Sequence, residues 1–232
     1  MEGVPYGTAK IFAAEGLCNL GVGGDFAFGN REKKIVYGLL KICRHCFSIS
    51  KNGFWVYTKG IMDMQKIKIE RASENDAEEI LALMKIIGSE TDNLSFGKEG
   101  LPASLAEEKA FLSEVASSER EAFFVARLDG KIVGTAHYTA FKKQRMAHRG
   151  EIGICVRKSA WGLGVGSKLM DSLVDFAKNT AKSEIIGLEV RSDNEGAIRL
   201  YKRFGFEKIG CFRGFFKIDG KLIDFDLMEK TL

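Results

Sequence analysis

The chain has 232 residues, of which 45% are hydrophobic and 28% charged, a composition ordinary for a soluble globular protein with a sizeable core. Its net charge of +4 is too small to indicate a nucleic-acid partner. No stretch approaches the roughly 18 consecutive apolar residues of a membrane span, and the first residues lack a signal-peptide pattern, so we expect a cytoplasmic protein without a membrane partner.

The five cysteines are odd in number and irregularly spaced, which argues against a disulfide framework. Cys43-Arg44-His45-Cys46 resembles half of a zinc site. A structural zinc ion needs four ligands, no second pair accompanies this one, and Cys18 adds at most one sulfur. We therefore predict that the protein binds no metal.

The first sixty or so residues show little sustained periodicity beyond short apolar runs, such as residues 35–43, which could form a short strand or helix. Met62 and Met64 stand directly before the first regular segment. We expect residues 1–63 to be an extension and not a folded domain, and hypothesise that it arises from the choice of start site. Residues 64–232 are expected to form one domain.

That domain begins with an alternating segment, Lys66–Glu70, which predicts a half-buried strand. Ser73, followed by acidic residues, predicts the start of a helix that runs through Met84. A second amphipathic helix is predicted from Ser104 to Val115. Asp129-Gly130 between apolar runs then predicts a hairpin of strands 122–128 and 132–139.

The basic run Lys142–Arg149 carries no interleaved aromatic residues, so we interpret it as a solvated loop between strands. The β-branched run Ile152–Val156 predicts a buried strand. It leads into Trp161-Gly162-Leu163-Gly164-Val165-Gly166-Ser167 and then a helix with an apolar stripe. A loop that opens a helix presents unpaired N–H groups and the positive end of the helix dipole, so it favours a phosphate.

Three kinds of glycine-rich loop compete for this interpretation. A Walker A loop requires Gly-Lys-Ser/Thr, whereas here Ser167 precedes Lys168. A Rossmann fingerprint requires Gly-x-Gly-x-x-Gly early in the chain, whereas these glycines run Gly-x-Gly-x-Gly and come late. A tight strand-to-helix connection without a ligand is the third possibility, and the loop alone does not exclude it.

The next strand is predicted at 184–190, and Asp193 or Asn194 is a suitable N-cap for the helix that follows. On this helix Tyr201 shares a face with Ala197, and Gly205 is placed to end it. A helical tyrosine is often an ordinary packing residue, and that alternative applies to Tyr201. Two closing strands are predicted at 206–211 and 222–228.

The segment from Asn194 to Phe206 and the glycine loop together resemble the GNAT superfamily of acyl-CoA-dependent N-acetyltransferases. That family carries an (Arg/Gln)-x-x-Gly-x-Gly/Ala loop and an Asn-x-x-Ala-x-x-Leu-Tyr-x-x-x-Gly-Phe helix. The resemblance implies an α/β (α+β) GNAT fold, with a mixed, mostly antiparallel sheet of about seven strands flanked by about four helices. Trp161 departs from the family's Arg or Gln, and we interpret it as a packing substitution.

The resemblance implies transfer of an acetyl group from acetyl-CoA to a primary amine by direct attack in a ternary complex. Tyr201 matches the family's general acid and Asn194 the position that bonds the pantetheine arm, while strand 152–156 matches the one that polarises the thioester carbonyl. Cofactor-binding positions implied in this way are Ile154, Cys155, Val156, Gly162, Leu163, Gly164, Val165, Gly166, Ser167, Asn194, Ala197 and Tyr201.

The general base is less determined. Glu151 corresponds to an acidic position that serves some family members, although a solvated strand-end carboxylate explains it equally well. His148 and His137 are alternatives, and each is more often a packing or surface imidazole.

The resemblance implies an amine acceptor but does not identify it, and it does not decide between a monomer and a homodimer. In the family the amine enters between the loop that joins the first two helices and the hairpin that joins the last two strands. The resemblance assigns this loop to 90–96, where Glu90 and Asp92 could attract a cation, and this hairpin to 212–216, whose Phe residues could wall a pocket. The alternative function is a non-catalytic acyl-CoA-binding sensor or structural module.

Overall fold

The computed structural model describes residues 47–49, 55–57 and 67–232 of the chain. The chain divides into two compact units, Met1–Ile61 and Met62–Leu232. In the first unit, strands β1 (Phe47–Ile49) and β2 (Trp55–Tyr57) pair antiparallel. Most of the expected extension, including the segment 35–43 and the Cys43/Cys46 pair, lies outside the described residues, so the domain boundary at residue 64 stays a prediction.

The second unit is built on one seven-stranded sheet with the order β3-β4-β5-β6-β7-β9-β8. Its neighbouring strands pair antiparallel except for β6 and β7, which pair in parallel. This arrangement confirms the expected mixed, mostly antiparallel sheet. The strands are β3 (Lys68–Arg71), β4 (Glu121–Leu128), β5 (Lys131–Ala140), β6 (Arg149–Val156), β7 (Ile185–Arg191), β8 (Glu207–Ile218) and β9 (Lys221–Thr231).

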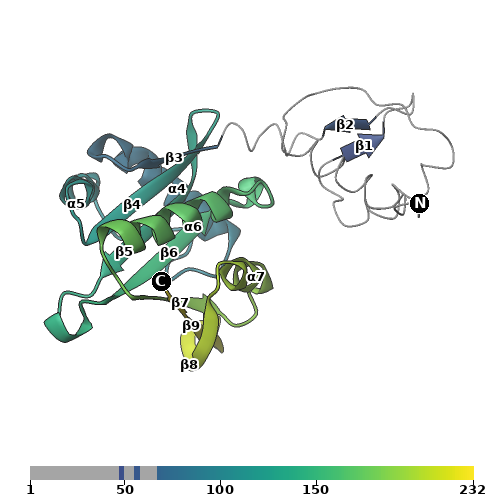
Figure 1. The fold of residues 1–232 in the computed structure, drawn as a ribbon. Helices are drawn as coiled ribbons and strands as arrows, with labels where there is room; N and C mark the ends of the chain where they lie inside the picture. Colours follow the sequence, from purple (N-terminus) through teal and green to yellow (C-terminus); the bar gives the residue numbers. More distant parts are fainter. Residues whose placement is uncertain (1–46, 50–54, 58–66) are drawn as a thin grey trace, which may run out of the picture. The chain divides into compact units, whose positions relative to one another are not determined.

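Four α-helices of the described residues flank this sheet, as expected, and Figure 1 shows α6 lying across one face of it. Leu169 and Leu173 of α6 pack with Ile186 of β7 in one buried cluster. Ile80 of α4 and Leu112 of α5 belong to a second cluster, which also holds buried residues of β4 and β5. The helices are α4 (Ala77–Glu90), α5 (Leu105–Ala116), α6 (Val165–Asp175) and α7 (Glu195–Arg203).

Several element ends fall where local sequence signals predict them. The Ser104 hydroxyl accepts the main-chain N–H of Glu107 at 3.3 Å, and the Glu107 carboxylate accepts the N–H of Ser104 at 2.8 Å, so α5 begins with a capping box. Asp129 and Gly130 have φ values of 51° and 81°, as a two-residue hairpin turn between β4 and β5 requires. Within the described residues, none of the helices combines the length and the apolar character needed to cross a bilayer.

The expected position of the last hairpin is wrong. Residues 212–216 lie inside β8, and the turn between β8 and β9 falls at Asp219-Gly220, with φ values of 49° and 79°. Gly214, with φ 61°, is instead part of a bulge in β8, and its N–H donates to the Asp224 carboxylate at 2.7 Å. A glycine inside a strand often marks such a bulge, because it adopts a positive φ at little cost.

Candidate active site

The sheet opens at the point where β6 and β7 part. Their parallel pairing covers only Arg149 to Glu151 on β6, opposite Ile185 to Gly187 on β7. Beyond Glu151, β6 continues to Val156 while pairing only with β5 on its other side. The main-chain groups on the open edge of residues 152–156 are therefore available to a ligand strand or chain.

A cavity of about 460 Å³ lies at this opening. It is lined by the end of α4 and the residues after it, the far half of β6, the glycine loop with the start of α6, and one face of α7. Eleven of the twelve positions expected to bind cofactor line the cavity, with Leu163 as the exception: Ile154, Cys155, Val156, Gly162, Gly164, Val165, Gly166, Ser167, Asn194, Ala197 and Tyr201.

The glycine loop presents the start of α6 to the cavity. Gly162 and Gly164 have φ values of 75° and 87°, and Gly164 is the N-cap residue of the helix. The first intrahelical bond runs from Lys168 N–H to the Gly164 carbonyl, so the preceding N–H groups have no partner within the helix. A Cβ on Gly166 would lie 3.1 Å from Leu200 of α7, which explains how the two helices approach each other so closely.

Trp161 differs from the expected packing residue. Its side chain is 51% exposed and lines the cavity. The indole N–H donates to the main-chain carbonyl of Val156 at 2.7 Å, which ties the loop to the end of β6. The indole therefore has no donor left for a phosphate.

Asn194 and Tyr201 reach the cavity from α7. Asn194 caps the helix, because its side-chain oxygen accepts the N–H of Ala197 at 3.2 Å. Tyr201 is 8% exposed, and its ring lies 6.0 Å from that of Phe206. Burial, and secondarily the neighbouring Cys155, raise the pKa of the Tyr201 phenol far above its ordinary value, so it stays protonated at neutral pH.

Cys155 faces the same cavity from β6 and pairs with Thr135 of β5. Burial raises the pKa of its thiol to about 11, although a hydrogen bond with Thr135 acts in the opposite direction. A thiol with so high a pKa is a poor nucleophile at neutral pH. Cys155 is therefore suited to packing against a ligand and not to carrying an acyl group.

Glu151 lies at the last paired position of β6, outside the cavity lining. Its side chain is exposed to solvent. Partial desolvation, and then the nearby Glu189, raise the pKa of its carboxyl, while Arg149 lowers it. A carboxylate at the mouth of the opening with a raised pKa is a better proton acceptor than an ordinary surface glutamate.

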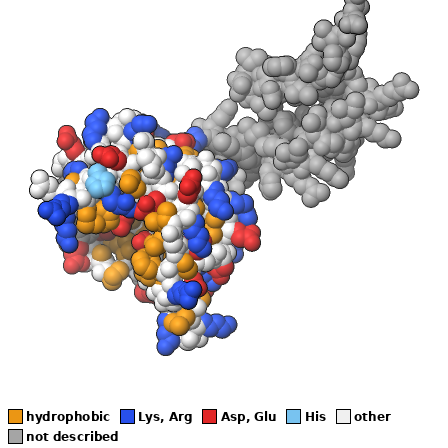
Figure 2. Space-filling view, turned by 60° about the horizontal axis from the view of Figure 1, so that its bottom comes forward, with side chains coloured by type: hydrophobic (Ala, Val, Ile, Leu, Met, Phe, Trp, Pro, Cys, Tyr) orange, Lys and Arg blue, Asp and Glu red, His pale blue; other side chains and the backbone are white. Residues whose placement is uncertain are grey.

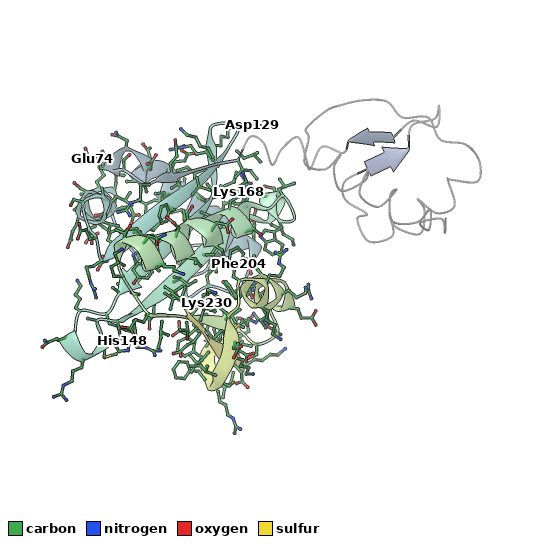
Figure 3. All side chains as sticks on the ribbon, viewed as in Figure 1. Glu74, Asp129, His148, Lys168, Phe204 and Lys230 are labelled. Atoms are coloured by element: carbon green, nitrogen blue, oxygen red, sulfur yellow. The ribbon has the colours of Figure 1, made fainter. Side chains whose placement is uncertain are left out.

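The two histidines considered as alternatives lie elsewhere. His137 is enclosed by the rings of Phe111 and Phe123, at 5.6 and 5.7 Å, and burial lowers its pKa. His148 lies near the end of the basic run 142–149 and, in Figure 3, at the end of the sheet away from Phe204 of α7. Neither lines the cavity.

The acidic side chains expected to attract an amine are also outside the cavity lining. The Glu90 carboxylate accepts the main-chain N–H of Lys158 at 2.5 Å and lies 3.9 Å from the guanidinium of Arg157, so it holds the segment between β6 and the glycine loop. The main-chain carbonyl of Asp92 accepts a bond from Arg191 at 3.4 Å. No group of three or more His, Cys, Asp or Glu residues in the described part of the chain is arranged to hold a metal ion.

Two contributions were missed at the level of sequence. Ile87 lines the cavity from the last turn of α4, and no local pattern marks it; Thr91, Asn93 and Leu94 also line the cavity and belong to the segment 90–96 that was expected to admit the acceptor. Arg203, in the last turn of α7, lines it as well, and its guanidinium lies 3.4 Å from the Ser167 hydroxyl. Its position two residues after Tyr201 on the same helix could have indicated that it lies near the cavity. Its contact with Ser167 could not be predicted, because this contact depends on how α6 and α7 pack.

Parallel strands that diverge beside a glycine-rich helix start are suited to an extended ligand with an anionic part. The sequence matches the family model described as the Acetyltransferase (GNAT) family over residues 89–206. The chain belongs to this family and is an acyl-CoA-dependent acyltransferase.

Relatives with assigned names agree with this family. The chain is 33% identical over 107 residues to the L-amino acid N-acetyltransferase AaaT of Escherichia coli, and this alignment covers 46% of this chain and 66% of that protein. It is 32% identical over 111 residues to the N-alpha-acetyltransferase RimI of Mycobacterium tuberculosis, covering 48% and 67%. The chain thus spans about two thirds of the length of each relative.

A solved structure shows the same fold. The acetyltransferase of the GNAT family from Streptococcus pneumoniae is 32% identical, with a TM-score of 0.69, and the match covers 72% of this chain and 99% of that one.

Proposed function

We propose that the protein transfers the acetyl group of acetyl-CoA to a primary amine by direct attack of the amine in a ternary complex. The observation that carries this proposal is the open edge of β6 beside the unpaired N–H groups of α6, within one cavity that also holds Tyr201. A free strand edge suits an amide-containing pantetheine arm, and a helix start suits a diphosphate. The residues present therefore fit acetyl-CoA as the acyl donor.

In this account the free N–H groups of β6 polarise the thioester carbonyl. The amine nitrogen forms a bond to the carbonyl carbon, the carbon–sulfur bond breaks, and the thiolate leaves with the bonding electron pair. The Tyr201 phenol, protonated because of its raised pKa, gives its proton to that thiolate. Asn194 lies at the start of the same helix and positions the pantetheine arm with its free side-chain N–H group.

The incoming amine must lose a proton, and Glu151 is the proposed acceptor, through a water molecule. It lies where β6 and β7 separate and its raised pKa makes it more basic than an ordinary carboxylate. We propose that the amine binds on the side of the cavity that is lined by Thr91, Asn93 and Leu94. The acceptor classes that this account allows are free amino acids, other small amines and peptide N-termini.

The second candidate function is an acyl-CoA-binding module without turnover. Thiol release from acetyl-CoA, measured with the full chain against polyamines, amino acids, aminoglycosides and peptides with different first residues, separates the two. We expect release with at least one of these amines. Binding of acetyl-CoA in calorimetry without release for any of them would favour the non-catalytic module instead.

A further inference from the structure

Trp161 combines three features that folding alone does not explain. It occupies the position where the family's loop carries Arg or Gln. Its indole N–H is used by the Val156 carbonyl, so the ring cannot donate a hydrogen bond to a ligand. Yet the ring is 51% exposed on a cavity wall, where a large apolar surface faces water.

Other groups that line the same cavity indicate which part of an acyl-CoA would reach this ring. The unpaired N–H groups at the start of α6 and the Arg203 guanidinium, 3.4 Å from the Ser167 hydroxyl, form a positive region in the same cavity. The thioester end is assigned to β6 and Tyr201, so the diphosphate falls at this positive region. The nucleotide end then lies at the glycine-loop end of the cavity, next to Trp161.

Adenine is the only aromatic group of acetyl-CoA, and a fixed indole offers it a flat partner. The hydrogen bond to Val156 holds the ring in place, so little side-chain entropy is lost when a base stacks on it. Stacking of a base on an aromatic side chain depends on the ring face and not on a hydrogen-bond donor. A tryptophan therefore provides a different kind of contact from the family's Arg or Gln.

We propose that Trp161 is the adenine-binding platform of this acetyltransferase, and that the side-chain cation for the phosphates comes from Arg203 on α7 and not from the glycine loop. This inference rests on the proposed use of acetyl-CoA. It goes further in assigning the nucleotide end of the ligand to two residues that the motifs do not specify.

The test compares two ligands with two matched variants of the full chain by calorimetry. Acetyl-CoA carries the adenosine, whereas acetyl-4′-phosphopantetheine lacks it. Trp161→Phe and Trp161→Leu both lose the hydrogen bond to Val156, but only Phe keeps an aromatic face. We expect Trp161→Leu to bind acetyl-CoA about tenfold more weakly than Trp161→Phe does. Acetyl-4′-phosphopantetheine should bind both variants and the unaltered protein within about twofold of one another, since no base is present to stack.

Equal affinity of the two variants for acetyl-CoA would overturn the proposal, as would an equal loss for both ligands, which would mean that Trp161 only shapes the loop. Failure of the unaltered protein to bind acetyl-CoA would contradict the proposed function itself. The two kinds of failure are therefore distinct.

Discussion

Glu189 is the residue that most affects the proposed base. Glu151 pairs with Gly187 across the last contact between β6 and β7, and Glu189 follows two residues later on the same face of β7. Both side chains are exposed to solvent. The negative charge of Glu189 is the second cause, after desolvation, of the raised pKa of Glu151.

Replacing Glu189 with Gln should therefore lower the pKa of Glu151, because a like charge that opposes its ionisation is removed. If Glu151 must be ionised for turnover, the acid limb of the pH profile of kcat moves to lower pH in Glu189→Gln. Glu195→Gln, which removes an exposed carboxylate on α7, is the control and should leave the limb in place. An unmoved limb in Glu189→Gln would remove Glu151 from the mechanism.

At the scale of elements, the packing of α4 against the segment that follows it depends on a close contact at Gly88. A Cβ on Gly88 would lie 1.9 Å from the carbonyl oxygen of Gly97, so α4 passes against the backbone of this segment. The same segment begins with Thr91, Asn93 and Leu94, which line the cavity. The close packing at Gly88 therefore supports one wall of the site.

Gly88→Ala should cost about 1–3 kcal/mol of unfolding free energy, because backbone atoms must shift to admit the methyl group. Gly196→Ala in α7 is the matched helical control, since its new Cβ would meet nothing closer than 3.8 Å. The control should be neutral or stabilising by up to about 1 kcal/mol. Denaturant midpoints measure both, and equal midpoints would show that α4 is not held as described.

Elements were predictable wherever a local signal sufficed, as at the Ser104 capping box and the Asp129-Gly130 turn. The equivalent Asp219-Gly220 turn was missed, because the last hairpin was expected at residues 212–216, where Gly214 instead forms part of a bulge inside β8. Most of the motif residues could be assigned to the cavity from the sequence, because the glycine loop and the segment from Asn194 to Phe206 form two recognisable motifs. The contribution of Arg203 could not, because it depends on how α6 and α7 pack.

At the scale of the whole molecule, the face of the described residues seen in Figure 2 carries no broad patch of one charge. Figure 2 shows basic and acidic side chains interspersed around apolar ones, in keeping with the small net charge of +4. Steering by a broad electrostatic field is therefore not expected, and ligand selection falls to the cavity itself. The account of the molecule thus rests on what happens inside that cavity, and above all on Tyr201.

The most direct test of this central claim compares Tyr201→Phe with Tyr138→Phe. Both changes remove the hydroxyl of a buried tyrosine, but the Tyr138 hydroxyl bonds Ser183 at 2.5 Å in the core and does not line the cavity. We predict that Tyr201→Phe lowers kcat by about a hundredfold or more, as loss of a general acid does, while the Kd for acetyl-CoA stays within about twofold. Tyr138→Phe should keep its kcat. Unchanged turnover in Tyr201→Phe would contradict the account.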